Sequence, residues 1–280
     1  MGRTTSALES GFAQVDGGRL FYEVSGSGSP VVLIHSGITD SRSWAPQVSA
    51  FEARHRVLRY DMRGIGRSDL GHGSYSNVDD LVRLIDAVEF ERAALVGVSM
   101  GGALALDVAL QHPARVAALV LVGAGIGGRQ LPDTFKAQME EVDALYERGL
   151  IDQVVERELE IWLYGKGRNA ADVDPAIREA VREMDRNTTE RFPADAKPER
   201  IEPPAVGRLG EIRVPTLVIV GDLDVDHVQE TARALRDGIV GARLDVMHGV
   251  AHVPNMERPE EFNRLVLDFL SGRTPTAVAT

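Results

Sequence analysis

Ser99 stands in a Gly-Val-Ser-Met-Gly sequence between an apolar run, residues 93–98, and a helix-compatible stretch, residues 103–110. A strand that turns into a helix within so few residues needs a strained backbone. Gly97 and Gly101, two positions on either side of the serine, leave room for it. Such a turn holds the serine hydroxyl out at the carboxyl end of the strand, above the first turn of the helix. This context predicts a nucleophilic serine.

A serine hydroxyl is a weak nucleophile at neutral pH and needs an adjacent base, which a third group orients. The chain has seven histidines, and we predict His252 as the base because it follows the short strand expected at residues 244–247. His248, close to the same strand, is the alternative. His35 ends the strand expected at residues 31–34, where it is better placed to shape the neighbouring loop.

Three aspartates follow the apolar run at residues 216–220 and compete for the role of the orienting acid. We predict Asp224, since it lies in the turn beyond the strand end and can reach a histidine from the neighbouring loop. Asp222, the first alternative, is suited to hold the turn by bonding to its own backbone. Asp226, the second, is suited to cap the following helix.

The elements that position these side chains alternate between strands and helices. Short, continuous apolar runs are typical of strands buried on both faces, and helices between such strands imply right-handed crossovers. The sequence therefore predicts an α/β fold, with a mostly parallel twisted sheet flanked by helices. We expect a hairpin at residues 12–24, strands at 31–34, 56–60, 93–98, 116–122, 214–220 and 244–247, and helices at 43–52, 77–90 (capped by Asn77), 103–110 and 259–270.

The pattern changes between residues 126 and 209. Helical stretches at 134–148, 150–163 and 175–186 follow one another without a strand, and a polar, proline-bearing segment at 192–207 closes the region. We interpret residues 126–209 as a helical cap inserted over the carboxyl ends of the strands, and residues 11–125 with 210–271 as the core domain. Residues 1–10 and 272–280 are expected to be loose termini. Trp162, within the insertion, is expected either to contact the substrate or to hold cap helices together.

Four segments of the chain together resemble the α/β-hydrolase-fold superfamily, over about residues 18–125 and 210–271. They are the loop His35-Ser-Gly37, the segment Tyr60-Asp-Met-Arg-Gly-Ile-Gly-Arg-Ser68, the turn Gly97-Val-Ser-Met-Gly-Gly102, and the loops that carry Asp224 and His252. The chain order serine, aspartate, histidine is the one described for this superfamily. The Gly-x-Ser-Met-Gly-Gly form is similar to that of enol-lactone hydrolases, small esterases and cofactor-free haloperoxidase-like perhydrolases.

The resemblance implies an oxyanion hole, in which two backbone amides stabilise the negative charge of a tetrahedral intermediate. The N–H groups of Met100 and Gly37 are the expected donors, with Ser36 or Ile38 as alternatives to Gly37. This chain has His-Ser-Gly where many relatives have His-Gly-aromatic, so the loop is expected to be less rigid and to leave space in the pocket. The side chains of Ser36 and Ile38 are also expected to contact the substrate.

The segment 61–68 carries two arginines and two glycines close to the expected active face. Arginine forks commonly hold a loop together through backbone carbonyls and a buried carboxylate. We therefore predict a structural role for this segment.

Composition excludes several kinds of partner. The net charge is −11 and the pI is about 5.2, whereas binding of nucleic acid requires clustered Lys and Arg. No apolar run approaches the roughly 18 residues that span a bilayer, so no membrane partner is expected. The chain has no cysteine and its histidines lack the spacing of metal ligands, so we expect no metal and no cofactor. These features are compatible with a cytoplasmic protein that acts on a small-molecule substrate, and they leave a homo-oligomer open.

The combined expectation is a cofactor-free serine hydrolase that cleaves a carboxylic ester or a lactone through an acyl-enzyme on Ser99. The same nucleophile and base serve perhydrolysis, C–C bond hydrolysis and lyase reactions, which form the alternative. A small-ligand receptor that has kept the fold without turnover is the remote alternative.

Overall fold

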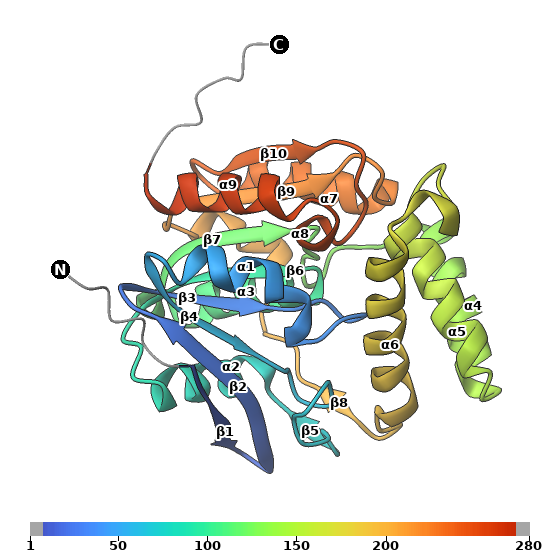
Figure 1. Cartoon of the computed structure of the whole chain (residues 1–280), viewed down its shortest axis with the longest axis horizontal. Coiled ribbons are helices and arrows are strands. Elements are labelled where there is room, and N and C mark those ends of the chain that lie inside the picture. Colours follow the sequence, from blue (N-terminus) through green and yellow to red (C-terminus); the bar gives the residue numbers. More distant parts are fainter. Residues whose placement is uncertain (1–7, 273–280) are drawn as a thin grey trace.

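Eight strands form the central sheet of the computed structural model, which describes residues 8–272 (Figure 1). Their order is β1-β2-β4-β3-β6-β7-β9-β10; β1–β2 and β2–β4 pair antiparallel and all the others parallel. The bounds are β1 Glu9–Val15, β2 Gly18–Gly26, β3 Ser29–Ile34, β4 His55–Tyr60, β6 Ala93–Val98, β7 Val116–Val122, β9 Thr216–Gly221 and β10 Arg243–Met247. The predicted mostly parallel sheet is confirmed, and the carboxyl ends of its parallel strands meet along one edge.

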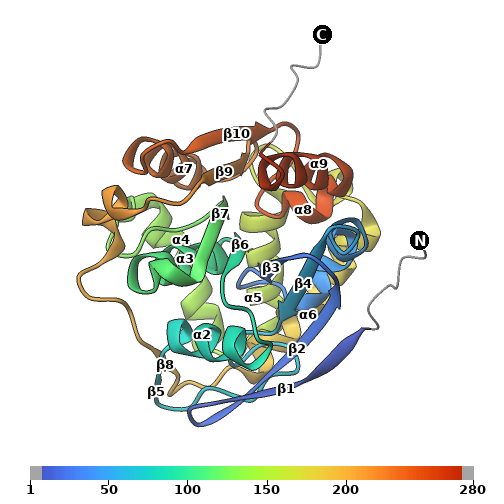
Figure 2. The same ribbon diagram turned by 90° about the vertical axis from the view of Figure 1, so that its left-hand side faces the viewer.

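Helices cover both faces of the sheet (Figure 2). One face carries α1 (Ala45–Phe51), α8 (Pro254–Glu257) and α9 (Pro259–Leu270), and the other carries α2 (Asn77–Ala87), α3 (Met100–Gln111) and α7 (Asp226–Gly238). Neighbouring residues of β3 divide between the two cores: Val32 packs with the α2 and α3 side, and Leu33 packs with the α1 and α9 side. This burial on both faces explains why the strands are apolar without alternation.

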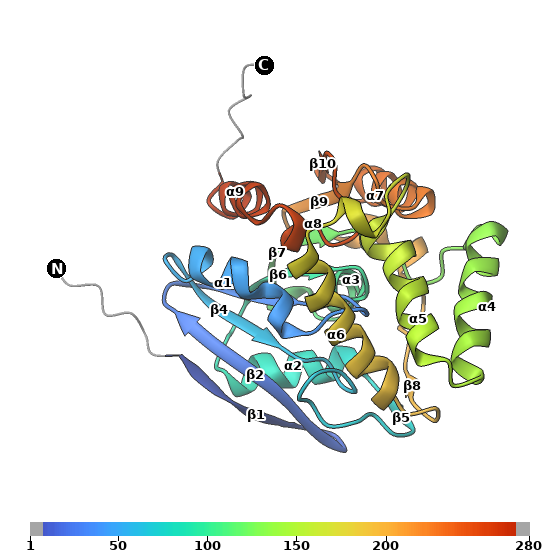
Figure 3. The same cartoon turned by 45° about the vertical axis from the view of Figure 1, so that its right-hand side comes forward.

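A set of helices, called here the inserted helices, lies between β7 and β9 in the sequence. It comprises α4 (Asp133–Glu147), α5 (Ile151–Glu158), a π-helical turn (Leu159–Tyr164) and α6 (Pro175–Arg191). In Figures 1 and 3 these helices stand beyond the carboxyl ends of the parallel strands. The three predicted helical stretches are confirmed, whereas the π-helical register of the turn was not predicted.

The segment that returns from the inserted helices to the core includes a short strand that the sequence did not predict. This strand, β8 (Lys197–Pro198), pairs in parallel with β5 (Ser74–Tyr75) and forms a separate two-stranded sheet. Each of these strands has only two residues, which is too short to show the alternation of apolar and polar residues that predicts a strand.

Local side-chain bonds shift two of the predicted helix starts. The prediction that Asn77 caps α2 is wrong: the cap is Ser76, whose Oγ accepts the Asp79 N–H at 3.1 Å. Ser76 has extended backbone angles (φ −106°, ψ 113°), whereas Asn77 already belongs to the helix. The helix expected at 43–52 begins as a 3₁₀ turn at Ser41–Trp44, capped by Asp40, and continues as α1.

The first strand of the sheet begins closer to the start of the chain than expected. β1 begins at Glu9, which pairs with Val24, so residues 9 and 10 belong to the sheet. Of the termini that were expected to be loose, residues 1–7 and 273–280 lie outside the described residues. Among residues 8–272, no helix combines the length and apolarity needed to cross a membrane.

The segment 61–68 has the structural role that the sequence predicts. Its buried Asp61 carboxylate accepts the backbone N–H groups of Ser41 and Arg67, each at 2.8 Å. The Arg63 guanidinium forks onto the Asp80 carboxylate with two contacts of 2.7 Å. Because the side chains of Arg63 and Asp80 are only 4% and 7% exposed, this pair joins the loop to α2 without contact with bulk water.

Replacing one partner of that buried pair should destabilise the fold strongly. We expect Arg63→Met to lower the free energy of unfolding by about 3–5 kcal/mol, because it leaves the Asp80 carboxylate buried without a cation. Urea titration measures the change. Arg19→Met is the control, since the Arg19–Asp69 pair is 48% and 37% exposed and should be worth less than about 1 kcal/mol. Equal losses in the two variants would contradict the structural role of Arg63.

Two carboxyl groups meet inside the inserted helices, Asp185 on α6 and Glu158 on α5. Asp185 is 2% exposed. Burial, together with the charge of Glu158 and a hydrogen bond to it, raises the pKa of Asp185 to about 9. Burial also raises the pKa of Glu158, and the charge of Asp143 on α4 adds to this effect. The raised pKa favours the protonated form of Asp185 at neutral pH.

This carboxyl pair should make the protein less stable at alkaline pH. Since the folded pKa of Asp185 lies above the unfolded value of about 3.9, the folded state loses stability as pH rises from about 4 towards 9. We expect Asp185→Asn to raise Tm above that of the wild type at pH 8, by about 2–4 °C per kcal/mol recovered, and to give a much smaller gain at pH 5. Calorimetry at pH 5, 6.5 and 8 measures this, with exposed Glu147→Gln as the control. A gain that is independent of pH would contradict the assignment.

Candidate active site

Ser99 connects β6 directly to α3 and has a left-handed φ of 55°, with ψ −115°. A Cβ on Gly97 would lie 2.3 Å from the Gly101 carbonyl oxygen. The turn is therefore so tight that position 97 requires glycine. The Ser99 N–H donates to the Val122 oxygen at 2.7 Å and ties the turn to the end of β7. Positive φ at a serine costs roughly 1–3 kcal/mol, which the surrounding bonds must offset. The predicted strained strand-to-helix turn is confirmed, and it leaves Ser99 partly exposed.

Asp224 and His252 meet as the sequence predicts. They follow β9 and β10, and His252 Nδ1 lies 2.7 Å from Asp224 Oδ2. The other Asp224 oxygen accepts the Val225 N–H at 2.8 Å. Both side chains are almost inaccessible, 3% exposed for His252 and 1% for Asp224. His252 Nε2 is buried and has no hydrogen-bond partner among the described residues, so the Ser99 hydroxyl and this nitrogen form no hydrogen bond in this structure, and their pairing stays a prediction.

Gly123, directly after β7, provides the space for this pair. A Cβ there would lie 3.1 Å from His252 Nδ1 and 3.4 Å from Asp224 Oδ2, and its φ of 52° is also one that side chains rarely adopt. The preceding residue, Val122, accepts the Ser99 N–H. The end of β7 therefore contacts both the serine turn, which follows β6, and the Asp–His pair, whose residues follow β9 and β10.

The alternative acids and base have other partners. Asp222 accepts the Gly249 N–H at 2.7 Å and contacts His248 Nδ1 at 2.8 Å, so it holds the neighbouring loop and not only its own turn. The His248 side chain is 82% exposed. Asp226 does not cap α7, since that cap residue is Val225; Asp226 pairs with Lys166 at the surface.

The loop after β3 is fixed by the His35 imidazole. The Met62 N–H donates to His35 Nε2 at 3.0 Å, so the proton is on Nδ1, which donates to the Ser36 carbonyl oxygen at 2.7 Å. Burial lowers the pKa of His35, which favours the neutral ring that these two bonds require. In a trans peptide the carbonyl and the next N–H point in opposite directions. The bond to Ser36 therefore sets the direction of the Gly37 N–H.

The amide of Ser36 already has a partner of its own. It donates to Thr39 Oγ1 at 3.2 Å, and the two hydroxyls of Ser36 and Thr39 lie 2.9 Å apart. Gly37 is partly exposed, whereas Ser36 and Ile38 are 1% and 5% exposed. A molecule placed above Ser99 would therefore find the Gly37 amide more accessible than its two neighbours; contact of the Ser36 and Ile38 side chains with a substrate stays a prediction.

Trp162 joins the inserted helices to His252. Its ring packs on the imidazole with centroids 4.5 Å apart, and its carbonyl oxygen accepts the His252 N–H at 3.2 Å. Phe135 of α4 packs edge-on against Trp162 at 5.7 Å and lies 4.6 Å from His227. Neither Phe135 nor His227 could be predicted from the sequence, because neither stands in a motif and their proximity depends on how α4 and α7 come together.

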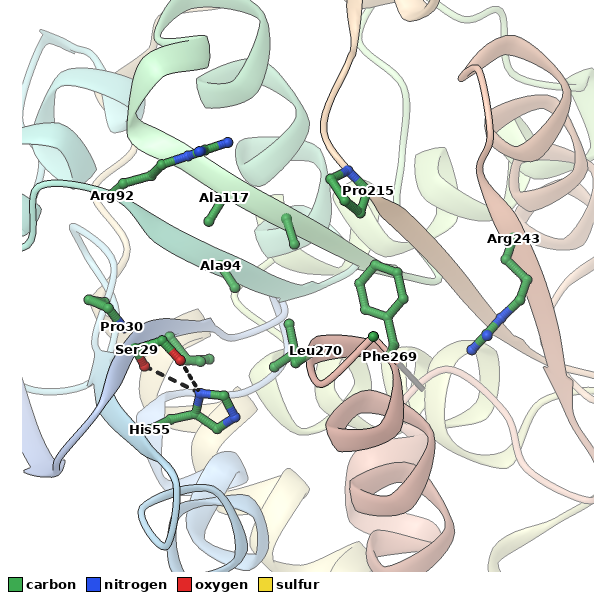
Figure 4. A pocket seen from close by; sticks show the side chains of 13 residues that line it. Ser29, Pro30, His55, Arg92, Ala94, Ala117, Pro215, Arg243, Phe269 and Leu270 are labelled. Carbon is green, nitrogen blue, oxygen red and sulfur yellow. Dashed lines mark hydrogen bonds between the residues drawn. The ribbon is translucent and has the colours of Figure 1, made fainter. Parts of the chain in front are cut away.

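A contact between a serine and a histidine occurs at the amino-terminal ends of β3 and β4, in a cavity of about 490 Å³ (Figure 4). Ser29 Oγ lies 3.0 Å from His55 Nδ1, and the Ser29 carbonyl oxygen lies 3.3 Å from the same nitrogen. A carbonyl can only accept, so Nδ1 carries the proton and cannot receive one from the Ser29 hydroxyl. None of the cavity-lining residues is a carboxylate. This pair connects the amino ends of β3 and β4 and lacks the arrangement of a nucleophile and base.

The order and direction of the strands, with helices on both faces, define the α/β-hydrolase fold. Residues 31–265 match the sequence profile of the alpha/beta hydrolase family, and the chain belongs to that family.

Relatives in this family act on different bonds. The chain is 34% identical to a Variovorax paradoxus protein provisionally named the carbamate hydrolase RutD, over 90% of this chain and 96% of the relative. It is 31% identical to the 2-hydroxy-6-oxononadienedioate/2-hydroxy-6-oxononatrienedioate hydrolase of Paraburkholderia xenovorans, over 95% and 97%. Among solved structures, the enol-lactonase of Burkholderia xenovorans superposes with a TM-score of 0.74 at 28% identity, covering 93% of this chain and all of that one. The family supports a hydrolytic role, and the bond that is cleaved differs among its members.

Proposed function

We propose that the protein is a serine hydrolase that cleaves a carboxylic ester or a lactone through an acyl-enzyme on Ser99. One observation carries the proposal: the buried Asp224–His252 pair, with Nε2 unoccupied, and the serine turn contact the same two residues at the end of β7. A nucleophile, a base and an orienting acid are the three groups that acyl transfer needs. The likeness to an enol-lactonase supports the ester or lactone class.

In the proposed mechanism, Ser99 Oγ attacks the carbonyl carbon while His252 Nε2 takes its proton. Asp224 accepts the Nδ1–H of His252, which fixes the tautomer in which Nε2 is the acceptor, and stabilises the imidazolium that forms. The tetrahedral oxyanion receives hydrogen bonds from the N–H groups of Met100 and Gly37. His252 then protonates the leaving alkoxide, and the same ring later activates the water that hydrolyses the acyl-enzyme.

We assign residues 126–209 the role of a cap over this site, with residues 11–125 and 210–271 as the core. The packing of Trp162 on His252 supports the assignment, because it places one of the inserted helices directly on the proposed base. The contact of Trp162 with Phe135 of α4 supports its expected role of holding cap helices together, and its contact with a substrate stays a prediction.

Hydrolysis of a C–C bond is the second candidate. The relative from Paraburkholderia xenovorans, whose name gives a dienedioate or trienedioate substrate, favours it. The same serine and histidine serve both reactions, so the shape of the pocket decides between them.

The nucleophile is tested by covalent labelling. We expect a fluorophosphonate probe to label the wild type at Ser99, and Ser99→Ala to lose both labelling and ester turnover, with kcat lower by at least about 10³-fold. Ser29→Ala, which removes the hydroxyl that contacts His55, is the matched control and should keep both. Labelling that survives in Ser99→Ala would refute the assignment.

A panel of esters, lactones, carbamates and vinylogous diketones distinguishes the two candidate reactions. We expect ester or lactone turnover to exceed diketone cleavage in kcat/KM, with both abolished in Ser99→Ala. Diketone cleavage without ester or lactone turnover would favour the second candidate.

The Gly37 donor is tested through the residue that holds its loop. Thr39→Val keeps the side-chain volume but removes the hydroxyl that accepts the Ser36 N–H. Complete loss of one oxyanion donor costs about 10²–10³-fold in kcat, so a displaced Gly37 amide should cost about 10-fold with KM nearly unchanged. Thr216→Val is the control: Thr216 is also buried and bonds a backbone carbonyl, at the amino end of β9. A kcat for Thr39→Val equal to that of the control would argue against Gly37.

A further inference from the structure

Residues 162–168, called here the strap, continue from Trp162 and contact the loops of both Asp224 and His252. Gly165 lies so close to them that a Cβ would be 2.3 Å from the Leu223 oxygen and 2.7 Å from the Ala251 side chain. Its φ of 69° also favours glycine. The next residue, Lys166, donates its N–H to the Leu223 oxygen at 2.7 Å. The strap therefore contacts the residue before the acid and the residue before the base.

Arg168 closes the strap and connects it to α8. Its Nη1 lies 2.6 Å from Glu257 Oε2, and their side chains are 13% and 7% exposed. The other guanidinium nitrogens donate to carbonyl oxygens of the strap and the preceding π-helical turn, Nε to Tyr164 at 2.7 Å and Nη2 to Leu163 at 2.8 Å. One planar cation thus holds the end of the turn that carries Trp162 and at the same time pairs with Glu257.

Glu257 in turn holds the loop of the proposed base. Its second oxygen, Oε1, accepts the Ala251 N–H at 2.8 Å. The next N–H, that of His252, donates to the Trp162 oxygen at 3.2 Å. The Ala251 and His252 amides are therefore held by Glu257 and Trp162. Arg168 pairs with Glu257 and also bonds the carbonyls that follow Trp162.

We propose that Arg168 and Glu257 are positioning residues for His252, an inference that rests on the proposed function. Through the Ala251 and His252 amides they keep Nδ1 on Asp224 and so fix the orientation of the ring that carries the unpaired Nε2. A misplacement of about 1 Å in such a group can cost about 10²-fold in rate. A role in stability alone explains the pair poorly, since buried ion pairs contribute little compared with apolar residues of the same volume.

Two variants test the pair. Glu257→Gln keeps the shape and an oxygen for the Ala251 N–H but removes the charge that Arg168 faces, and Arg168→Met removes every guanidinium donor. We expect both to lower kcat for an activated ester by about 10–100-fold with KM within about 3-fold, and to slow fluorophosphonate labelling of Ser99 by a similar factor. Arg168→Lys, which retains a cation beside Glu257, should recover part of both rates.

The matched control is the Arg59–Glu23 pair between β4 and β2. It has a contact of 2.7 Å and side chains 19% and 12% exposed, and Glu23 bonds no residue of the Asp224 or His252 loops. Glu23→Gln should leave kcat and the labelling rate within about 2-fold of the wild type. Thermal melting of each variant measures folding; if Arg168→Met does not fold, Glu257→Gln decides.

The outcomes separate this inference from the proposed function. A wild type that is not labelled at Ser99 would overturn the proposed function, and the inference with it. A wild type that is labelled, with Glu257→Gln as fast as Glu23→Gln in both assays, would overturn the inference alone. An increase in KM without a fall in kcat would also overturn it, because the pair would then affect substrate binding and not the placement of His252.

Discussion

The hydrogen bond between Asp224 and His252 imposes the main constraint on this end of the molecule. A carboxylate that is 1% exposed loses its hydration, a cost of several kcal/mol that only well-placed donors can offset. Asp224 has two such donors, the His252 ring and the Val225 N–H. The loops that carry Gly123, Asp224 and His252 must therefore approach one another closely, and residue 123 has to lack a side chain where they meet. The sheet achieves this because β6, β7, β9 and β10 are consecutive parallel neighbours whose carboxyl ends share an edge.

The inserted helices are part of this constraint, since they contact the base directly. His252 lies between Gly123 on the core side and the Trp162 ring on the other side. The π-helical turn brings Trp162 to this place, and π-helical turns are frequent at functional sites because the extra residue redirects side chains. Because Trp162 packs on the His252 ring and accepts its N–H, a movement of the inserted helices would disturb the proposed base.

The sequence was informative where chemistry and backbone geometry restrict the residue type. Gly97 and Gly101 around Ser99, the apolar strands and the two loops after β9 and β10 were predicted, because few residues satisfy those requirements. The predicted cap residue Asn77 was wrong by one position, since both Ser76 and Asn77 are suitable caps and only the backbone angles distinguish them. The connection from Arg168 through Glu257 to Ala251 could not be predicted. It joins residues 89 and 6 positions apart on separate elements, and charged side chains at these spacings are ordinary on solvated helices.

Distances alone would not identify the proposed base, because four histidines in this chain have similar contacts. His248 lies 2.8 Å from Asp222, His252 lies 2.7 Å from Asp224, His72 lies 3.0 Å from Asp195 and His55 lies 3.0 Å from Ser29. The His248 and His72 side chains are exposed, so water competes for both partners and the interactions are weak. The His55 ring donates to a carbonyl and faces no acid. Only the His252 pair is removed from water, where the low dielectric strengthens the carboxylate–imidazole bond and leaves the opposite ring nitrogen to act as the acceptor. Burial, set by the strands below and the strap above, thus separates the proposed base from residues of the same type and similar geometry.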